Sequence, residues 1–75
     1  MQIMDKAIYI TGASSQIGES LRIKFSNSGH KVIIYGRNEL KIFSNETFVK
    51  YHLGDNIDPL DGDYEHIIFN LAHDY

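Results

Sequence analysis

A glycine-bearing turn between an apolar segment and an amphipathic segment has the clearest chemistry in this sequence. The turn, residues 11–18, reads Thr-Gly-Ala-Ser-Ser-Gln-Ile-Gly and follows the apolar residues 7–10. A helix that begins after such a turn starts with unpaired backbone N–H groups and a partial positive charge, and both attract phosphate. Glycine allows a tight turn and a close approach of a ligand to the backbone. The pattern therefore predicts a pyrophosphate site.

Other binding chemistries fit the sequence less well. Five residues separate Gly12 from Gly18, whereas a Walker A loop has four, and Glu19 stands where that loop carries its lysine. The chain has no cysteine, which excludes disulfides and thiolate metal sites. The histidines share no metal-ligand spacing on one helix. The acidic stretch 55–65 indicates a solvated loop, because Gly62 is misplaced for a calcium-binding loop.

Four strands and one helix are expected to position the turn. The helix is predicted over 16–28, with Ser14 or Ser15 as its N-cap and Gly29 as a left-handed stop. Its apolar stripe is Ile17, Leu21 and Phe25, with Glu19, Arg22 and Lys24 outside it. Continuous apolar runs are typical of parallel strands covered on both faces. The predicted strands are 7–10, 32–35, 48–53 and 67–71.

The remaining connections contain little helix by the same criteria. Residues 39–44 are compatible with one or two helical turns capped by Asn38, and Asp58-Pro59 with a single turn within the aspartate-rich stretch 54–65. Only His73-Asp74-Tyr75 follow the apolar run at 67–72, so we expect the front part of a longer protein or a truncated one. The predicted core is Ile8, Ile10, Ile17, Leu21, Phe25, Val32, Ile34, Val49, Ile67 and Phe69.

Length and charge limit the classes of partner. Seventy-five residues make one small domain, and the formal net charge of −3 disfavours nonspecific binding to nucleic acid. The sequence shows no signal peptide and no apolar run of the ~20 residues that a membrane span needs. We therefore expect a cytoplasmic protein that binds neither nucleic acid nor membrane. Self-association through an open fourth strand is also expected.

The turn resembles that of the short-chain dehydrogenase/reductase superfamily, which reads TGxxxGxG in one branch and TGxxGxxG in the extended branch. Gly12 and Gly18 match both forms, while Ser15 and Gln16 occupy the two places of the middle glycine. Residues 27–32 resemble the passage into the family's second strand, and 54–58 its "GDxxD". Residues 69–72 resemble the end of its fourth strand, and the Leu71-Ala72 ending is similar to the extended branch, which includes sugar-nucleotide epimerases and dehydratases.

The resemblance implies an α/β fold: the first half of a doubly wound Rossmann domain over 1–75. It further implies a parallel sheet of order 3-2-1-4, truncated after the fourth strand and without the substrate-binding part. The cofactor's pyrophosphate would contact the turn, and its 2′-phosphate would contact the end of the second strand. Its adenine would contact the third connection, and its ribose would contact the end of the fourth strand. The implied binding residues are Gly12, Ser14, Ser15, Gln16, Ile17, Gly18, Arg37, Asn38, Asp55, Asn56, Asn70, Leu71 and Ala72. Taken alone, Asp55 and Asp58 are better explained as turn formers and helix caps, and the alternative for Asn70 is that it closes hydrogen bonds inside the fold.

The end of the second strand favours NADP over NAD. Members that bind NAD carry a carboxylate there for the ribose 2′-OH, but this chain has Gly36 followed by Arg37. A guanidinium pairs with a 2′-phosphate through two charge-assisted hydrogen bonds. A solvated Arg37, with Glu39 close by and NAD as the cofactor, is the alternative.

The family's catalytic pair, a tyrosine with a lysine four residues later, does not occur in this sequence. No catalytic residue is therefore assigned. The expected function is the NADP(H)-binding portion of an oxidoreductase or sugar-nucleotide epimerase/dehydratase, with a nucleotide-sugar or other small substrate held by a longer chain. The alternatives are a non-catalytic NAD(P)-sensing or scaffold protein and an inert fragment.

Overall fold

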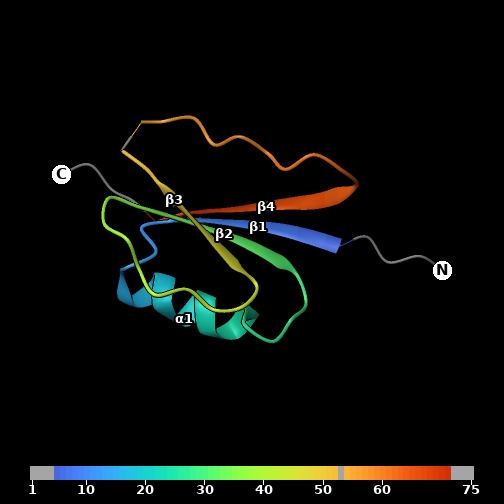
Figure 1. Cartoon of the computed structure of the whole chain (residues 1–75), viewed down its shortest axis with the longest axis horizontal. Coiled ribbons are helices and arrows are strands. Elements are labelled where there is room, and N and C mark those ends of the chain that lie inside the picture. Colours follow the sequence, from blue (N-terminus) through green and yellow to red (C-terminus); the bar gives the residue numbers. More distant parts are fainter. Residues whose placement is uncertain (1–4, 53, 72–75) are drawn as a thin grey trace.

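The computed structural model describes residues 5–52 and 54–71. Within them, four strands form one sheet in which every neighbouring pair is parallel, with the order β3-β2-β1-β4 (Figure 1). The α/β Rossmann-like half fold and its strand order are thus confirmed. The elements are β1 (Asp5–Thr11), α1 (Gln16–Phe25), β2 (Lys31–Gly36), β3 (Glu46–Lys50) and β4 (Tyr64–Asn70).

The two central strands are buried because both of their faces are covered. Alternate residues of β1 and β2 belong to two separate apolar clusters, one on each face of the sheet. The register aligns Ile8 of β1 with Val32 of β2 and Ile67 of β4, so that apolar residues meet across three strands. The continuous apolar sequence of both strands follows from this double burial.

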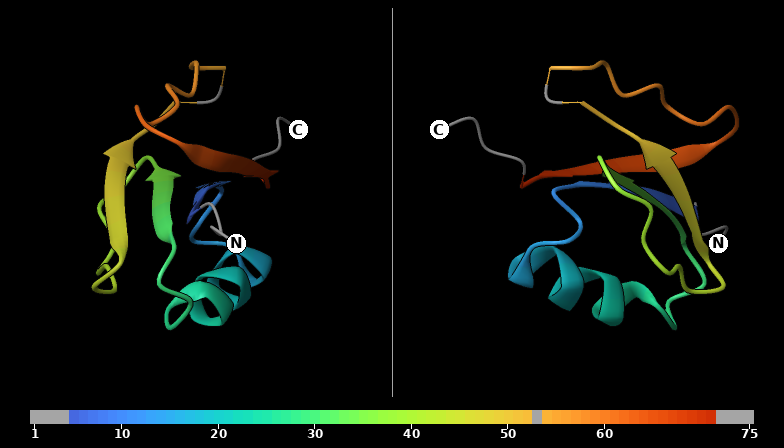
Figure 2. Two further views of the ribbon diagram at one scale, coloured as in Figure 1. Left: turned by 90° about the vertical axis from the view of Figure 1, so that its right-hand side faces the viewer. Right: turned by 60° about the vertical axis from the view of Figure 1, so that its left-hand side comes forward.

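Helix α1 covers one face of the sheet (Figure 2). Leu21 and Phe25 pack against a cluster formed by Ile8, Ile10, Ala13, Val32 and Ile34. Ile17 was also expected in this core, but 65% of it is exposed. The inward stripe is instead Gly18, Leu21, Arg22 and Phe25, with spacing i, i+3, i+4 and i+7. Because Gly18 of α1 faces the turn, the preceding residue, Ile17, points outwards.

The opposite face is covered by the extended connection between β3 and β4 (Figure 2). Its half-buried residues Tyr51, Ile57 and Leu60 pack with Tyr64 over a cluster formed by Ala7, Tyr9, Ile33 and Tyr35. The buried Tyr9 hydroxyl fastens this connection: it accepts a hydrogen bond from the Leu60 N–H at 3.0 Å and lies 2.8 Å from Nδ1 of His66. The single helical turn expected at Asp58-Pro59 is not formed. Glycine, proline and aspartate disfavour helix in this stretch.

Several element bounds differ from those expected. Helix α1 ends at Phe25 rather than at 28, because the N–H and hydroxyl of Ser26 both bond the Ile23 carbonyl and the next residues form turns. Gly29 does adopt a left-handed φ of +78°, but after those turns. Strand β3 covers 46–50 rather than 48–53, and β1, β2 and β4 extend beyond their predicted apolar cores. Leu53 lies outside the described residues.

Edge position explains the other core corrections. Val49, expected in the core, is 40% exposed because β3 is an edge strand of the described sheet. Ile67 and Phe69 of β4, the other edge, are half-buried. Among the described residues, no helix has the length and apolar character needed to cross a membrane.

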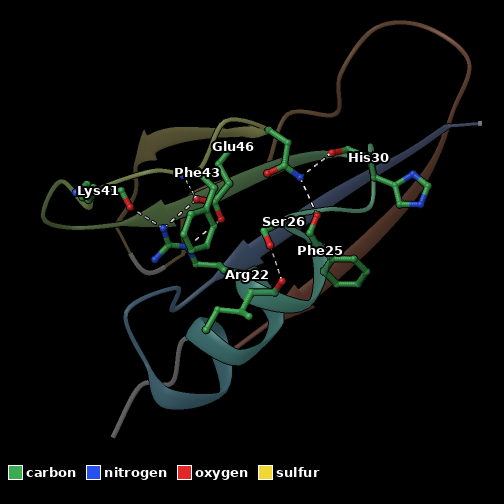
Figure 3. A network of polar contacts seen from close by, with 9 residues as sticks. Arg22, Phe25, Ser26, His30, Lys41, Phe43 and Glu46 are labelled. Carbon is green, nitrogen blue, oxygen red and sulfur yellow. Dashed lines mark hydrogen bonds and ion pairs between the residues drawn. The ribbon is translucent and has the colours of Figure 1, made fainter.

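The connection between β2 and β3 contains no helix and is held by a buried ion pair (Figure 3). Arg22 of α1 donates from Nε and Nη2 to the two carboxylate oxygens of Glu46, each at 2.9 Å. Nη2 also donates to the Lys41 carbonyl at 2.7 Å, and the guanidinium lies 5.0 Å from the centre of the Phe43 ring. The bond to Glu46 raises the pKa of Arg22. Arg22 was expected outside the packed face of α1, and this was wrong.

Candidate functional site

The glycine turn closes on itself through Ser15. Gly12 has a φ of +66°, which glycine adopts without a steric penalty. The Ser15 hydroxyl donates to the Gly12 carbonyl at 2.7 Å and accepts from the Gly18 N–H at 3.0 Å. Ser15 is therefore the N-cap of α1, one of the two residues predicted for that role.

Gly18 lets the helix start press against the turn. A Cβ on Gly18 would lie 2.6 Å from the Gly12 carbonyl oxygen and 2.9 Å from two Ala13 backbone atoms. The N–H groups of Gln16 and Ile17, the first two of α1, precede any possible i−4 partner within the helix. Ser14, Gln16 and Ile17 are all exposed. The helix N-terminus thus presents donors at the carboxyl edge of the sheet, where an anion can reach them.

The end of β4 is joined to the end of β1. The register aligns Thr11 with Asn70, and the Thr11 hydroxyl donates to Oδ1 of Asn70 at 2.7 Å. The Leu71 N–H is 3.0 Å from the same hydroxyl oxygen. Asn70 and Leu71 therefore lie beside the first residue of the glycine turn, as a shared site requires. Ala72 lies outside the described residues.

The end of β2 carries Gly36, a position where the fold does not require glycine, followed by the exposed Arg37. Tyr35 aligns with Thr11, so Gly36, Arg37 and Asn38 follow at the same edge as the turn. Gly36 does not have a positive φ, and an added Cβ would meet Phe48 and Asn38 only at ordinary contact distances, 3.5 and 3.7 Å. Arg37 and Asn38 are exposed, and Arg37 forms no ion pair with any residue of the described part.

The two residues expected at the adenine are used differently. Asp55 closes a turn: its carboxylate accepts from the His52 N–H, and its own N–H donates to the His52 carbonyl, both at 2.9 Å. Asn56 lines a cavity on the sheet face away from α1. No residue of the glycine turn lines that cavity. The structure therefore gathers the predicted residues of β1, α1, β2 and β4 at one edge and does not bring Asn56 into the same pocket.

Burial of Tyr35 has an effect that can be measured in alkali. Burial, followed by the charges of Tyr9, Asp58 and Tyr51, raises the pKa of Tyr35 from 10.0 to about 12. Between these values the unfolded chain loses the phenol proton while the folded chain keeps it, so the free energy of unfolding falls as pH rises. We expect Tyr35→Phe to flatten this fall, as followed by circular dichroism. Equal pH dependence in both proteins would contradict the assignment.

Comparison with known proteins gives a partial similarity. The chain is similar to oxidoreductases. One, named an uncharacterized oxidoreductase, is from Staphylococcus epidermidis and is 39% identical over 41 residues, which cover 55% of this chain and 18% of that protein. Another of the same description, from Staphylococcus saprophyticus, is 40% identical over 42 residues, covering 56% and 18%. The chain thus matches less than a fifth of these relatives' length. No family model and no solved structure matches it.

Proposed function

We propose that this chain is the dinucleotide-binding portion of an oxidoreductase. The exposed N-terminus of α1 supports this most directly, because Gly12 and Gly18 hold it against the end of β1 at the carboxyl edge of the sheet. In open parallel α/β sheets, ligands bind at that edge, where the strand order reverses. Here the reversal lies between β1 and β4, because β2 and β3 follow on one side of β1 and β4 returns to the other. The names of the partial relatives agree with this function.

The residues at this edge fit a dinucleotide. The N–H groups of Gln16 and Ile17 and the Ser14 hydroxyl would hold the pyrophosphate, and Asn70 and Leu71 would meet a ribose. When bound, the nicotinamide would supply the hydride chemistry. We assign the chain to the short-chain dehydrogenase/reductase superfamily and favour its extended branch on the Leu71-Ala72 ending. The substrate, and the groups that move its proton, would belong to a longer chain.

We infer a preference for NADP from Arg37 and Gly36. Neither the backbone conformation at position 36 nor the space for a Cβ requires glycine, so the absence of an acid there is not explained by the fold. The exposed guanidinium that follows forms no ion pair with the described residues and would be free to pair with a 2′-phosphate.

Calorimetric titration with NADP and NAD tests both steps. We expect NADP to bind at least about tenfold more tightly, because hydrogen bonds to charged groups contribute roughly 1.5–3 kcal/mol. Arg37→Ala should remove this advantage and leave NAD binding unchanged. Lys24→Ala, which removes an exposed cation from the last turn of α1, is the matched control. Equal binding of both dinucleotides by the unmodified chain would contradict the NADP preference; no binding of either by a folded chain would contradict the dinucleotide site itself.

A second variant introduces the carboxylate that NAD-binding members carry at the end of the second strand. Gly36→Asp combined with Arg37→Ala should reverse the preference towards NAD, since a carboxylate at this place accepts from the ribose 2′-OH and repels a 2′-phosphate. The same titration measures the reversal. Retained NADP preference in this variant would show that the end of β2 does not select the cofactor.

A non-catalytic sensor or scaffold is the second candidate. Ser15, at one of the two places of the family's middle glycine, uses its side chain to cap α1. A side chain there leaves less room for a close pyrophosphate, which fits binding without turnover. A Tyr-x-x-x-Lys pair in a longer chain would decide for the enzyme.

A further inference from the structure

A cavity of about 570 Å³ lies on the face of the sheet opposite α1 and extends to the residues that precede β2 and β3. Ile33, Tyr35 and Val49 line it from β2 and β3, while Leu60 and Tyr64 line it from the covering connection and the start of β4. None of the residues at the N-terminus of α1 lines it. Its size falls in the range of roughly 300–1,000 Å³ that is usual for small-molecule sites with apolar walls.

Tyr35 places an unsatisfied polar group in this cavity. The residue is 4% exposed, yet its hydroxyl forms no hydrogen bond with any residue in 5–52 or 54–71. The hydroxyl is not fully enclosed either, because Asn45 Oδ1 is the single enclosed side-chain atom of the described residues without a partner. The small accessible part of Tyr35 therefore includes its hydroxyl, at the cavity wall. This accessible hydroxyl has no partner among the described residues, and a ligand in the cavity would supply one.

The charged groups around the cavity favour a positively charged ligand. Asp58 and Asp61 line it and form no ion pair within the described part of the chain. Glu46 also lines it but is neutralised by Arg22. Lys31, the first residue of β2, also lines the cavity. Two unpaired carboxylates therefore line the cavity against one lysine, and a ligand with a positive charge would balance the excess of negative charge.

We propose that this cavity binds a small organic cation: an ammonium group joined to a flat apolar body. The body would lie between the apolar walls from β2 and β3 and those from the covering connection. The ammonium would face Asp58 and Asp61 and lie within reach of the Tyr35 hydroxyl and of an aromatic face. This site lies on a different part of the molecule from the proposed dinucleotide site, and neither depends on the other.

Three probes that share a phenylethyl body and differ in their end group test the proposal on the 75-residue chain. 2-Phenylethylammonium, 2-phenylethanol and 3-phenylpropionate present the same ring with a positive, neutral or negative end. Binding is followed by the NMR shifts of the Ile33, Val49 and Leu60 methyl groups. We expect the ammonium to bind at least tenfold more tightly than the alcohol, and the carboxylate less tightly than either. Equal binding of the three probes, or methyl groups that do not respond to the ammonium, would overturn the proposal.

Variants separate the site from general attraction by an acidic protein. Asp58→Asn with Asp61→Asn should abolish the preference for the ammonium, and Tyr35→Phe should weaken its binding severalfold. Asp63→Asn with Glu65→Gln removes the same charge from exposed residues outside the cavity and should leave the preference intact. Equal losses in the two double variants would overturn the proposal, because the attraction would then be nonspecific. The backbone spectrum of each variant establishes that it is folded.

Discussion

Glu46→Gln is expected to cost about 3 kcal/mol or more of unfolding free energy, enough to unfold much of so small a protein. Arg22 and Glu46 side chains are 9% and 1% exposed, so the change leaves a guanidinium charge inside the fold without its counter-charge. The same carboxylate accepts from the Phe43 N–H at 2.8 Å, and an amide in its place cannot accept with both of its terminal atoms. The connection between β2 and β3 would therefore loosen with the ion pair.

Urea denaturation followed by circular dichroism measures this loss. Glu39→Gln, which removes an exposed carboxylate from the same connection, is the matched control and should shift the midpoint little. Arg22→Met combined with Glu46→Leu should recover part of the stability, because replacing both partners removes the stranded charge. A loss in Glu46→Gln no larger than in Glu39→Gln would show that the pair contributes nothing.

Gly18→Ala should destabilise the chain although alanine is the better helix former. Helix propensity alone predicts a gain of roughly 0.5–1 kcal/mol for this change. The added methyl group would instead lie 2.6 Å from the Gly12 carbonyl oxygen, a backbone atom that cannot rotate away. Overpacking of this kind costs typically about 1–3 kcal/mol, and relieving it must move α1 away from the turn. Both stability and NADP affinity should therefore fall.

Ser20→Ala provides the comparison, because Ser20 is exposed on the same helix and its change tests propensity without crowding. Thermal unfolding and NADP titration of the two variants give the two readouts. Were Gly18→Ala as stable as Ser20→Ala and equally able to bind NADP, the close contact between α1 and the turn would have no role in either property.

The sequence predicted the central part of the fold well. Continuous apolar runs identify β1 and β2 because both faces of these strands are covered, and this burial needs no side-chain alternation. The connection from β2 to β3 was harder to predict. It depends on Arg22 reaching Glu46, 24 residues away along the chain, and no local pattern marks such a contact. The sequence pattern of an amphipathic helix predicts that Arg22 faces solvent, because nothing in it indicates the distant partner.

In the candidate site, too, features formed by nearby residues could be predicted and features formed by distant residues could not. Ser15 and Gly18 act within a few residues of one another, so their types and spacing predict the cap and a tight turn, which the structure shows. The cavity beside Tyr35 could not be predicted in this way. The cavity is lined by two strands and by a connection without regular structure. Along each of these segments, lining residues are separated by residues that do not line the cavity. The two hydrogen bonds of Asp55 to His52 agree with the turn-forming role that its position suggested.

The position of β1 and β2 in both apolar clusters has a consequence for how the molecule opens. Because each strand supplies alternate residues to each face, the loss of either strand from the sheet disrupts both clusters. The sheet and α1 should therefore melt as one cooperative unit. The covering connection is different, since the hydrogen bond that ties its middle to the sheet within the described residues runs from the Leu60 N–H to a side chain, the Tyr9 hydroxyl. We therefore expect residues 54–63 to detach from the sheet at a lower free energy than is needed to unfold the strands and α1.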